Sequence, residues 1–338
     1  MEIRRVQMTG GSSYVITLPK DWVESVHIKK NDPLGVIVQP DGTLLITKNT
    51  TGDQIQRIKN LEITSDIDPD FFLRNLIGIY IAGYNAIHIT TKDRVTGPVR
   101  MKLREFSNMV IGPEFVEETE SSVLIKDLLN PLEMPIQNSL KRMFVIVRGM
   151  HTDAIEGFIA HNSDLISDVI ERDNDVDRLF WLVARQTNMI LHNVHLSKKM
   201  NVNISEMLPH FQVARIIERV GDHSVRIAKN AGKISTSIIP DEINDQIRSA
   251  SEGALTAFEK SIESFFTHDL KKANKTIEYM HQMEETYSLI NTKILSLPVN
   301  LAVSVRNITD SIRRSGEYSA DIAENVINYE MMRENNSI

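Results

Sequence analysis

Residues 219–230, RVGDHSVRIAKN, return further along the chain as RSGEYSADIAEN, residues 314–325. The two segments share Arg, Gly, Ser, Ile-Ala and Asn at matching places. Each lies in a long stretch of helical period with few breakers, and six such stretches follow Pro131: 132–160, 163–199, 207–234, 240–267, 269–296 and 299–333. An internal repeat of this kind predicts two tandem three-helix bundles made by duplication.

The composition is that of a globular chain with room for more than one domain. The 338 residues are 41% hydrophobic and 25% charged, and they include no cysteine. Disulfides, thiolate metal sites and a catalytic cysteine are therefore excluded. No apolar run approaches the roughly eighteen residues that a membrane helix needs, and the first residues lack the apolar segment of a signal peptide. We expect a cytoplasmic protein that is not inserted in a membrane.

The first 48 residues predict a small β unit rather than a bundle. The expected elements are a strand at 14–18, a short helix at 20–27 and a hairpin of strands at 34–38 and 44–47. Gly10-Gly11 precedes the first strand, Pro19 stops it, and Asp41-Gly42 is a strong hairpin turn signal. So small a unit buries too little surface to be stable alone, and we expect it to dimerise through its strands.

The run TGGSSYVITLPKDWVESVHIKKNDPLGVIVQPDGTLLITK, residues 9–48, resembles the swapped-hairpin domain of the AbrB and SpoVT type, a dimeric DNA-binding module of bacterial and archaeal regulators. One departure is Asn31-Asp32, where that family usually has Gly-Asp. The resemblance implies that basic residues near the strand starts meet DNA phosphates, and the candidates are Arg4, Arg5 and Lys20. The alternative is that these charges are only solvated.

Charge is compatible with DNA contact through this segment alone. The chain has a net charge of -7, but residues 1–48 carry six Lys or Arg against five Asp or Glu. The acidic excess therefore belongs to the remainder, which makes a DNA contact through the bundles an unfavourable one.

Residues 50–130 predict a small α/β connector. Asp68-Pro69 starts a helix that runs to Gly83 or just beyond. Strands are expected at 85–90, 114–118 and 122–125, with a polar region at 94–105 and a break at 128–131. The predicted fold is thus multi-domain and mainly α, with domains at 1–49, 50–130, 131–236 and 237–335.

Four carboxylates in the first bundle form two pairs at helical spacing. Asp173 and Asp177 share one face of a helix, and Glu218 and Asp222 share one face of another. Like charges at this spacing cost only about 0.2–0.5 kcal/mol per pair. Three arginines stand close enough in sequence to offset that cost: Arg172, Arg178 and Arg219. Ordinary ion pairs are therefore one interpretation.

The second interpretation is a metal site. Counting helical turns places Asp173 inside or beside the apolar stripe of its helix, where an ionised group needs a partner. If the two helices face each other across a groove, the four carboxylates supply hard oxygen ligands that suit iron, manganese, magnesium or zinc.

These paired motifs, with the phrase ERVGDHSVRIA at 218–228, are similar to the PhoU family of phosphate-signalling regulators over about residues 131–332. The resemblance implies multinuclear iron or zinc clusters held by Asp173, Asp177, Glu218 and Asp222, with Asp175 and Glu171 as further carboxylates of the same helix. It also implies repression of phosphate uptake in concert with the phosphate ABC transporter and, in bacteria, its sensor kinase.

The second bundle departs from this pattern. Met280 and Glu284 stand where the first repeat has Asp173 and Asp177, and Arg313 and Glu317 replace Glu218 and Asp222. A guanidinium at Arg313 would pair with Glu317 or Glu284 and occupy the place of a metal. We therefore predict one competent site, or none, per chain.

Joining the parts predicts a function. A swapped-hairpin module fused to PhoU-like bundles resembles archaeal regulators in which a phosphate-linked sensor acts on DNA directly. We expect a homodimeric or larger phosphate-responsive transcriptional regulator of phosphate-uptake promoters, with no catalytic residues. Two alternatives remain: an adaptor that docks on the transporter ATPase and inhibits it, using the N-terminal domain only to dimerise, and a metal-dependent enzyme of the carboxylate-bundle kind. The latter is disfavoured because the Glu278 to His281 spacing of di-iron bundles has no second copy.

Overall fold

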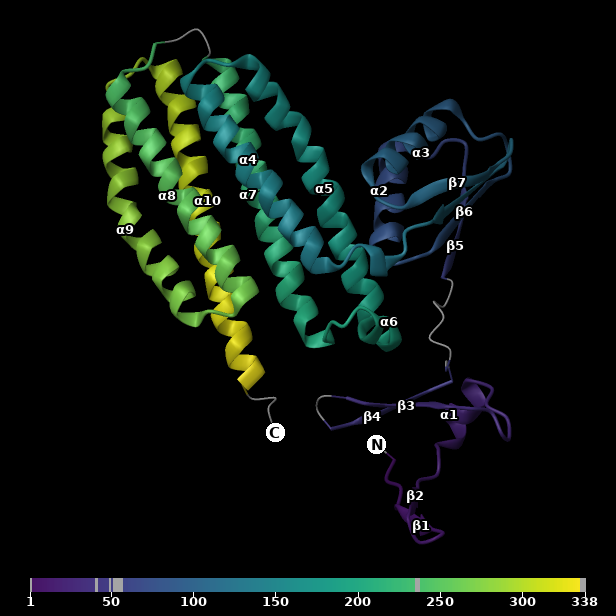
Figure 1. Ribbon diagram of the computed structural model, residues 1–338. Helices are drawn as coiled ribbons and strands as arrows, with labels where there is room; N and C mark the ends of the chain where they lie inside the picture. The colour runs from purple at the N-terminus through teal and green to yellow at the C-terminus, as the bar shows by residue number, and fades with distance from the viewer. Residues whose placement is uncertain (1, 40–41, 49, 51–56, 235–237, 335–338) are drawn as a thin grey trace. The chain divides into compact units, whose positions relative to one another are not determined.

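The computed structural model describes residues 2–39, 42–48, 50, 57–234 and 238–334 (Figure 1). The chain divides into two compact units, Met1–Ile55 and Gln56–Ile338, which we call the N-terminal unit and the C-terminal unit.

The N-terminal unit consists of two short hairpins and one helix. Its elements are β1 (Gln7–Thr9), β2 (Ser13–Val15), α1 (Lys20–Ser25), β3 (Gly35–Val38) and β4 (Leu44–Thr47). The predicted hairpin of β3 and β4 is confirmed, with Val36 opposite Ile46. The predicted strand at 14–18 is only partly correct, because the strand is β2 and ends at Val15. Gly10 and Gly11 have φ of 63° and 82° and form the turn of an antiparallel hairpin with β1, which the sequence analysis missed.

The C-terminal unit begins with a two-layer α/β part. Its elements are β5 (Ile58–Ile63), α2 (Pro69–Ile81), β6 (Ala86–Thr91), α3 (Gly97–Met109), β7 (Pro113–Glu118) and β8 (Ser122–Asp127). The sheet order is β5-β6-β8-β7, with β5 parallel to β6 and the other pairs antiparallel. Helices α2 and α3 lie on the same side of this sheet and share a core with it (Figure 1).

The helix start at Asp68 is confirmed, since its carboxylate accepts a hydrogen bond of 2.6 Å from the Phe71 N–H. The expectation of a merely polar region at 94–105 was wrong. Helix α3 occupies it and buries Val99, Leu103 and Phe106 at helical spacing, despite few other apolar residues. Strand β5 was also missed.

The rest of the C-terminal unit is a pair of three-helix bundles. The first contains α4 (Ile136–Ile159), α5 (Ser163–Leu191) and α7 (Met207–Lys233), and the second contains α8 (Asp241–Thr267), α9 (Leu270–Ile294) and α10 (Val299–Glu334). The predicted stretch 163–199 breaks because Asn193 caps a separate short helix, α6 (Val194–Lys199), by accepting hydrogen bonds from the backbone of His195 and Leu196.

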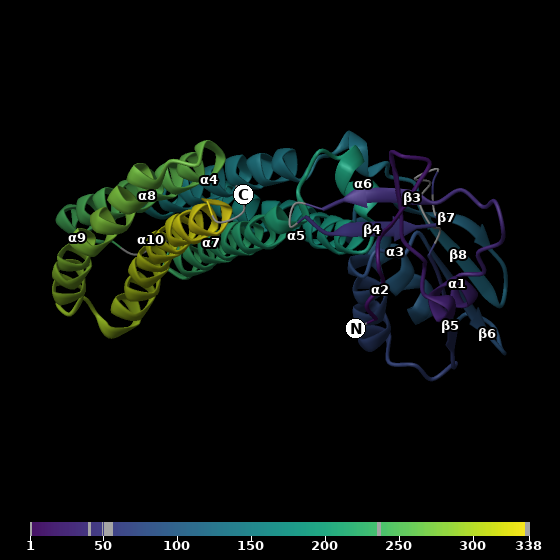
Figure 2. The same cartoon turned by 90° about the horizontal axis from the view of Figure 1, so that it is seen from below.

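The two bundles share one continuous core. Helix α10 packs against α7 of the first bundle as well as against α8 and α9 of its own (Figure 2). Across the described ranges, no helix is both long enough and apolar enough to span a bilayer.

One buried arginine ties the α/β part to the first bundle. Arg185 of α5 is 1% exposed. Its guanidinium donates to Asp127 Oδ2 at 2.6 and 3.0 Å and to the carbonyls of Tyr80 and Tyr84 at 2.6 and 2.8 Å. These bonds satisfy a charge that would otherwise be costly to bury. No local sequence pattern singles out Arg185 for this role.

Candidate metal centre

The four predicted carboxylates lie on two helices that pack together. Asp173 and Asp177 come from α5, and Glu218 and Asp222 come from α7. Gly221, beside Asp222, packs closely on α4, because a Cβ there would lie 3.3 Å from Val147 Cγ2.

Burial raises the pKa of all four groups, and repulsion between carboxylates adds to this effect at Asp173, Asp177 and Glu218. Burial raises the pKa of Glu218 to about 7, and the charges of Asp222 and Asp177 add to the effect. Burial likewise raises the pKa of Asp177 to about 6, with further contributions from Asp173 and Asp222. The pKa values of Asp173 and Asp222 rise for the same first reason, burial. Each carboxylate thus lies within electrostatic range of at least one other, and the four form one group.

The neighbouring arginines form no ion pair with this group within the described residues, although the charge of Arg219 partly offsets the rise in the pKa of Glu218 and Asp222. Arg172 pairs with Asp153 and with Asp168, 2.8 Å away. Arg219 lies over the ring of Tyr318, 5.7 Å from its centroid. Among the residues that the structure describes, no ion pair or hydrogen bond engages the side chains of the four carboxylates. Asp173, Asp177 and Glu218 are half-buried, and Asp222 is exposed by surface area. All four therefore lack a direct partner among the described residues.

The donor chemistry of this group fits a hard cation, but the site is not closed. Within the described parts of the chain, no three His, Asp or Glu side chains already surround a common point at coordination distance. The side chains of Asp173, Asp177, Glu218 and Asp222 would have to turn toward a shared ion. Glu171 and Asp175 are both exposed on α5.

The second bundle replaces the acidic group by an ion pair and a packed methionine. Arg313 pairs with Glu317, as predicted, and donates to Asp310 Oδ1 at 3.0 Å. Met280 is buried in contact with Gly316. A cation is therefore already present, as the Arg313 guanidinium, where the first bundle leaves its acids unpaired.

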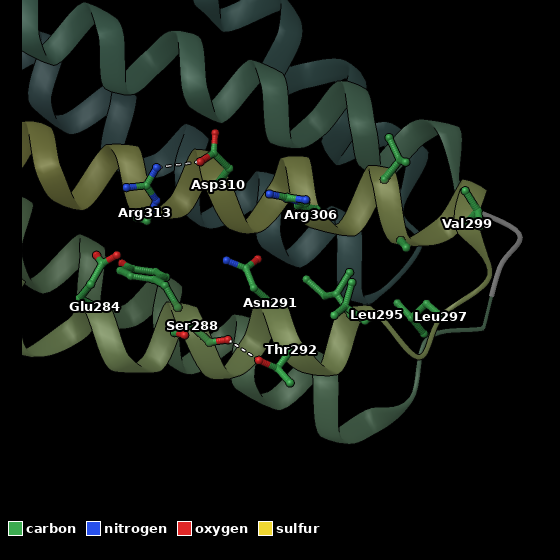
Figure 3. Close-up of a pocket in the computed structure, with 14 residues that line it drawn as sticks. Glu284, Ser288, Asn291, Thr292, Leu295, Leu297, Val299, Arg306, Asp310 and Arg313 are labelled. Carbon is green, nitrogen blue, oxygen red and sulfur yellow. Dashed lines mark hydrogen bonds and ion pairs between the residues drawn. The ribbon is translucent and has the colours of Figure 1, made fainter.

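Beside Arg313 the second bundle also has a cavity that sequence reasoning missed. It has a volume of about 710 Å³ and lies between α9 and α10. Figure 3 shows Asn291 and Arg306 along it, with the Arg313–Asp310 pair at one end. In the repeat alignment the place of Arg306 is taken by Phe211, which stacks on Phe180 at 5.9 Å in the first bundle. In the second copy Tyr287 keeps the place of Phe180, so the cavity lies where one aromatic ring, that of Phe211, is replaced by Arg306.

The three candidate DNA contacts are on the surface of the N-terminal unit. Arg4 Nη2 lies 2.6 Å from Glu2 Oε2, and Lys20 Nζ lies 3.6 Å from Glu24 Oε1. Arg5 is exposed, and no ion pair engages it within the described residues. Such exposed pairs are worth about 0–1 kcal/mol, so a phosphate would displace them easily.

Two protein families match this chain, one over the two bundles and one over the N-terminal unit. The family described as "PhoU domain" matches residues 140–231 and 247–326. The family described as "Antidote-toxin recognition MazE, bacterial antitoxin" matches residues 7–53.

One relative and two solved structures give the same result. The chain is 21% identical over 191 residues to the phosphate-specific transport system accessory protein PhoU homolog of Zymomonas mobilis, covering 52% of this chain and 75% of the relative. PhoU from Pseudomonas aeruginosa superposes with a TM-score of 0.51 at 16% identity, covering 58% of this chain and 96% of the other. The phosphate transport system regulatory protein PhoU from Streptococcus pneumoniae superposes with a TM-score of 0.50 at 16% identity, covering 58% of this chain and 94% of the other. At these identities the two structures establish the fold.

Proposed function

The chain belongs to the PhoU family, and on that premise we propose that it is a phosphate-responsive transcriptional regulator of phosphate uptake. The C-terminal unit senses and the N-terminal unit contacts promoter DNA. The observation that carries this proposal is the presence, in one chain, of two PhoU matches and a MazE-type match. It is a regulator and not an enzyme.

The N-terminal unit acts as a dimer in this proposal. Ile37, at 5% exposed, is the only buried side chain among its described residues. Large apolar side chains remain exposed on its strands and ends, such as Ile3 at 84%, Tyr14 at 78% and Val38 at 69%. A second copy would cover this surface. Two copies would then offer Arg4, Arg5 and Lys20 twice to one duplex.

Metal ions bound by Asp173, Asp177, Glu218 and Asp222 form the second part of the proposal. Iron or zinc is the family expectation, and magnesium or manganese also suits carboxylate oxygens. The bound cation would supply the positive charge that the acids lack. For the metal to control DNA binding, it must bind the DNA-competent and the incompetent state with different affinity.

The test of DNA contact is a selection of genomic DNA fragments by the full-length protein over a range of salt. We expect enrichment of phosphate-uptake promoters and an affinity that falls steeply with salt. A variant with Arg4, Arg5 and Lys20 all changed to alanine should lose the enrichment and flatten the salt dependence. The matched control changes Lys29 and Lys30, two exposed lysines of the same unit, to alanine. Equal DNA binding by both variants would contradict the assigned contacts.

The second candidate function is an adaptor that inhibits the phosphate ABC transporter, with the N-terminal unit only dimerising. It is favoured by the names of the relatives, an "accessory protein" of a phosphate-specific transport system and a transport system "regulatory protein". In that case the protein would enrich no DNA at low salt, and it would bind the transporter ATPase instead.

A further inference from the structure

A groove of about 480 Å³ lies beside the carboxylate group, where the first bundle meets α10 of the second. Asp173 of α5 and Asp222 of α7 line its acidic side. Three basic residues of α7, which we call the basic row, also line the groove: Arg226, Lys229 and Lys233. Asn230 of α7 and Asn307 of α10 complete the lining of polar residues.

The acids and the basic row are near each other but do not pair. The charge of Lys229 lowers the pKa of both Asp173 and Asp222, so it lies within electrostatic range of them. Yet no member of the basic row forms an ion pair with any residue that the structure describes. Opposite charges thus face the same groove across a gap, which a bound cation and anion would fill.

Helix geometry explains only part of the basic row. Lys233 lies in the last turn of α7, where a cation is stabilised by the helix dipole. That stabilisation falls off within the last turn. Lys229 and Arg226 lie further from the helix end and are exposed to solvent, so a ligand in the groove can reach both side chains.

We propose that the basic row binds inorganic phosphate next to the metal ion held by the carboxylates. This inference rests on the proposed metal site and adds the second ligand to it. The groove presents three basic and two acidic side chains, an excess of one positive charge. A divalent cation at the acids raises that excess by two charges, so a phosphate dianion should bind much better when the metal is present. The volume admits phosphate, a cation and several waters of about 30 Å³ each.

The location couples this site to the arrangement of the two bundles. Asn307 of α10 donates to Asn230 Oδ1 of α7 at 3.3 Å, on the wall of the groove. Phosphate oxygens would compete for these amides and so contact both bundles at once. Binding would therefore bias the packing of α10 against α7, which is a route from ligand to a change in the whole C-terminal unit.

The test is calorimetric titration of the full-length protein with Mn²⁺ and with inorganic phosphate, each alone and in the presence of the other. Mn²⁺ should tighten phosphate binding at least tenfold, and phosphate must tighten Mn²⁺ binding by the same factor, because the coupling is reciprocal. Lys229→Gln should weaken phosphate binding about tenfold or more. The variant should still bind the same number of Mn²⁺ ions per chain as the wild type. Lys271→Gln, which changes an exposed lysine of α9, is the matched control and should leave both unchanged.

The outcomes separate this inference from the proposed function. If the wild-type protein binds no Mn²⁺, the metal site fails and the phosphate site fails with it. If Mn²⁺ binds but phosphate does not, or if Lys229→Gln binds phosphate like the wild type, this inference alone is overturned. A further titration with AMP tests the source of the phosphoryl group, and binding of AMP tighter than that of phosphate would contradict inorganic phosphate as the ligand.

Discussion

Replacement of Glu218 by glutamine should stabilise the metal-free protein at pH 8. The pKa of Glu218 rises from 4.5 to about 7, first because the group is buried and then because Asp222 and Asp177 are close. At about 1.4 kcal/mol per pKa unit, the full rise corresponds to about 3 kcal/mol. The side chain is only half-buried, and solvent screening reduces the gain to about 1–2 kcal/mol.

The sign of the pH dependence follows from proton binding. Between pH 4.5 and about 7 the folded state keeps a proton on Glu218 that the unfolded chain releases, so stability falls as the pH rises. The penalty is complete above pH 7 and absent below the ordinary pKa. The advantage of Glu218→Gln over the wild type should therefore be largest at pH 8 and fall to about half of that value or less at pH 5.

The assay is urea unfolding in the presence of a chelator, followed by far-ultraviolet circular dichroism, because almost all helices lie in the C-terminal unit. Glu171→Gln, at an exposed carboxylate of α5, is the control and should change stability by less than about 0.5 kcal/mol. Added Mn²⁺ should reverse the order, because it stabilises the wild type more than the variant. A variant that is no more stable than the wild type at pH 8 would refute the reasoning.

Three further predictions test other parts of the molecule. Arg185→Met should lower the free energy of unfolding by about 3–5 kcal/mol by leaving Asp127 buried and unpaired, and Asp127→Asn in the same chain should restore part of it; a loss below 1 kcal/mol in urea unfolding would contradict this role. Val38→Lys should shift the protein from dimer to monomer in sedimentation, and an unchanged dimer would show that this strand face is not the interface. Met280→Asp combined with Arg313→Glu recreates the acidic pattern in the second bundle and should raise the number of Mn²⁺ ions bound per chain, whereas an unchanged number would show that these side chains are not what excludes metal.

The helices were predictable wherever periodicity and breakers agreed. The six long stretches correspond to α4, α5 with α6, and α7 to α10, since Pro and Gly are rare inside them and caps lie at their ends. Helix α3 was not predictable in the same way. It begins with Gly97 and Pro98, and polar residues separate the three side chains that it buries, Val99, Leu103 and Phe106. Strand β5 depends on parallel pairing with β6, and no local sequence pattern predicts that contact.

For the candidate metal site, the sequence predicted which carboxylates share a helix face, but not which side chains pair with them. Spacing places Asp173 and Asp177, and then Glu218 and Asp222, on helix faces, but the absence of ion partners required the structure, because Arg172 turns to Asp153. The role of Arg185 depends on Tyr80 and Asp127, far away in the sequence. The groove at the basic row likewise joins residues of α5 and α7 to Asn307 of α10, which are far apart in the sequence.

The central claim is that one chain joins a phosphate sensor to a DNA-binding unit. The most direct measurement is the affinity of the full-length protein for a phosphate-uptake promoter of its own genome, titrated at fixed salt with Mn²⁺ and inorganic phosphate. We predict sequence-selective binding whose dissociation constant changes at least tenfold when both ligands are added. The absence of selective binding, or an affinity that responds to neither ligand, would contradict the account.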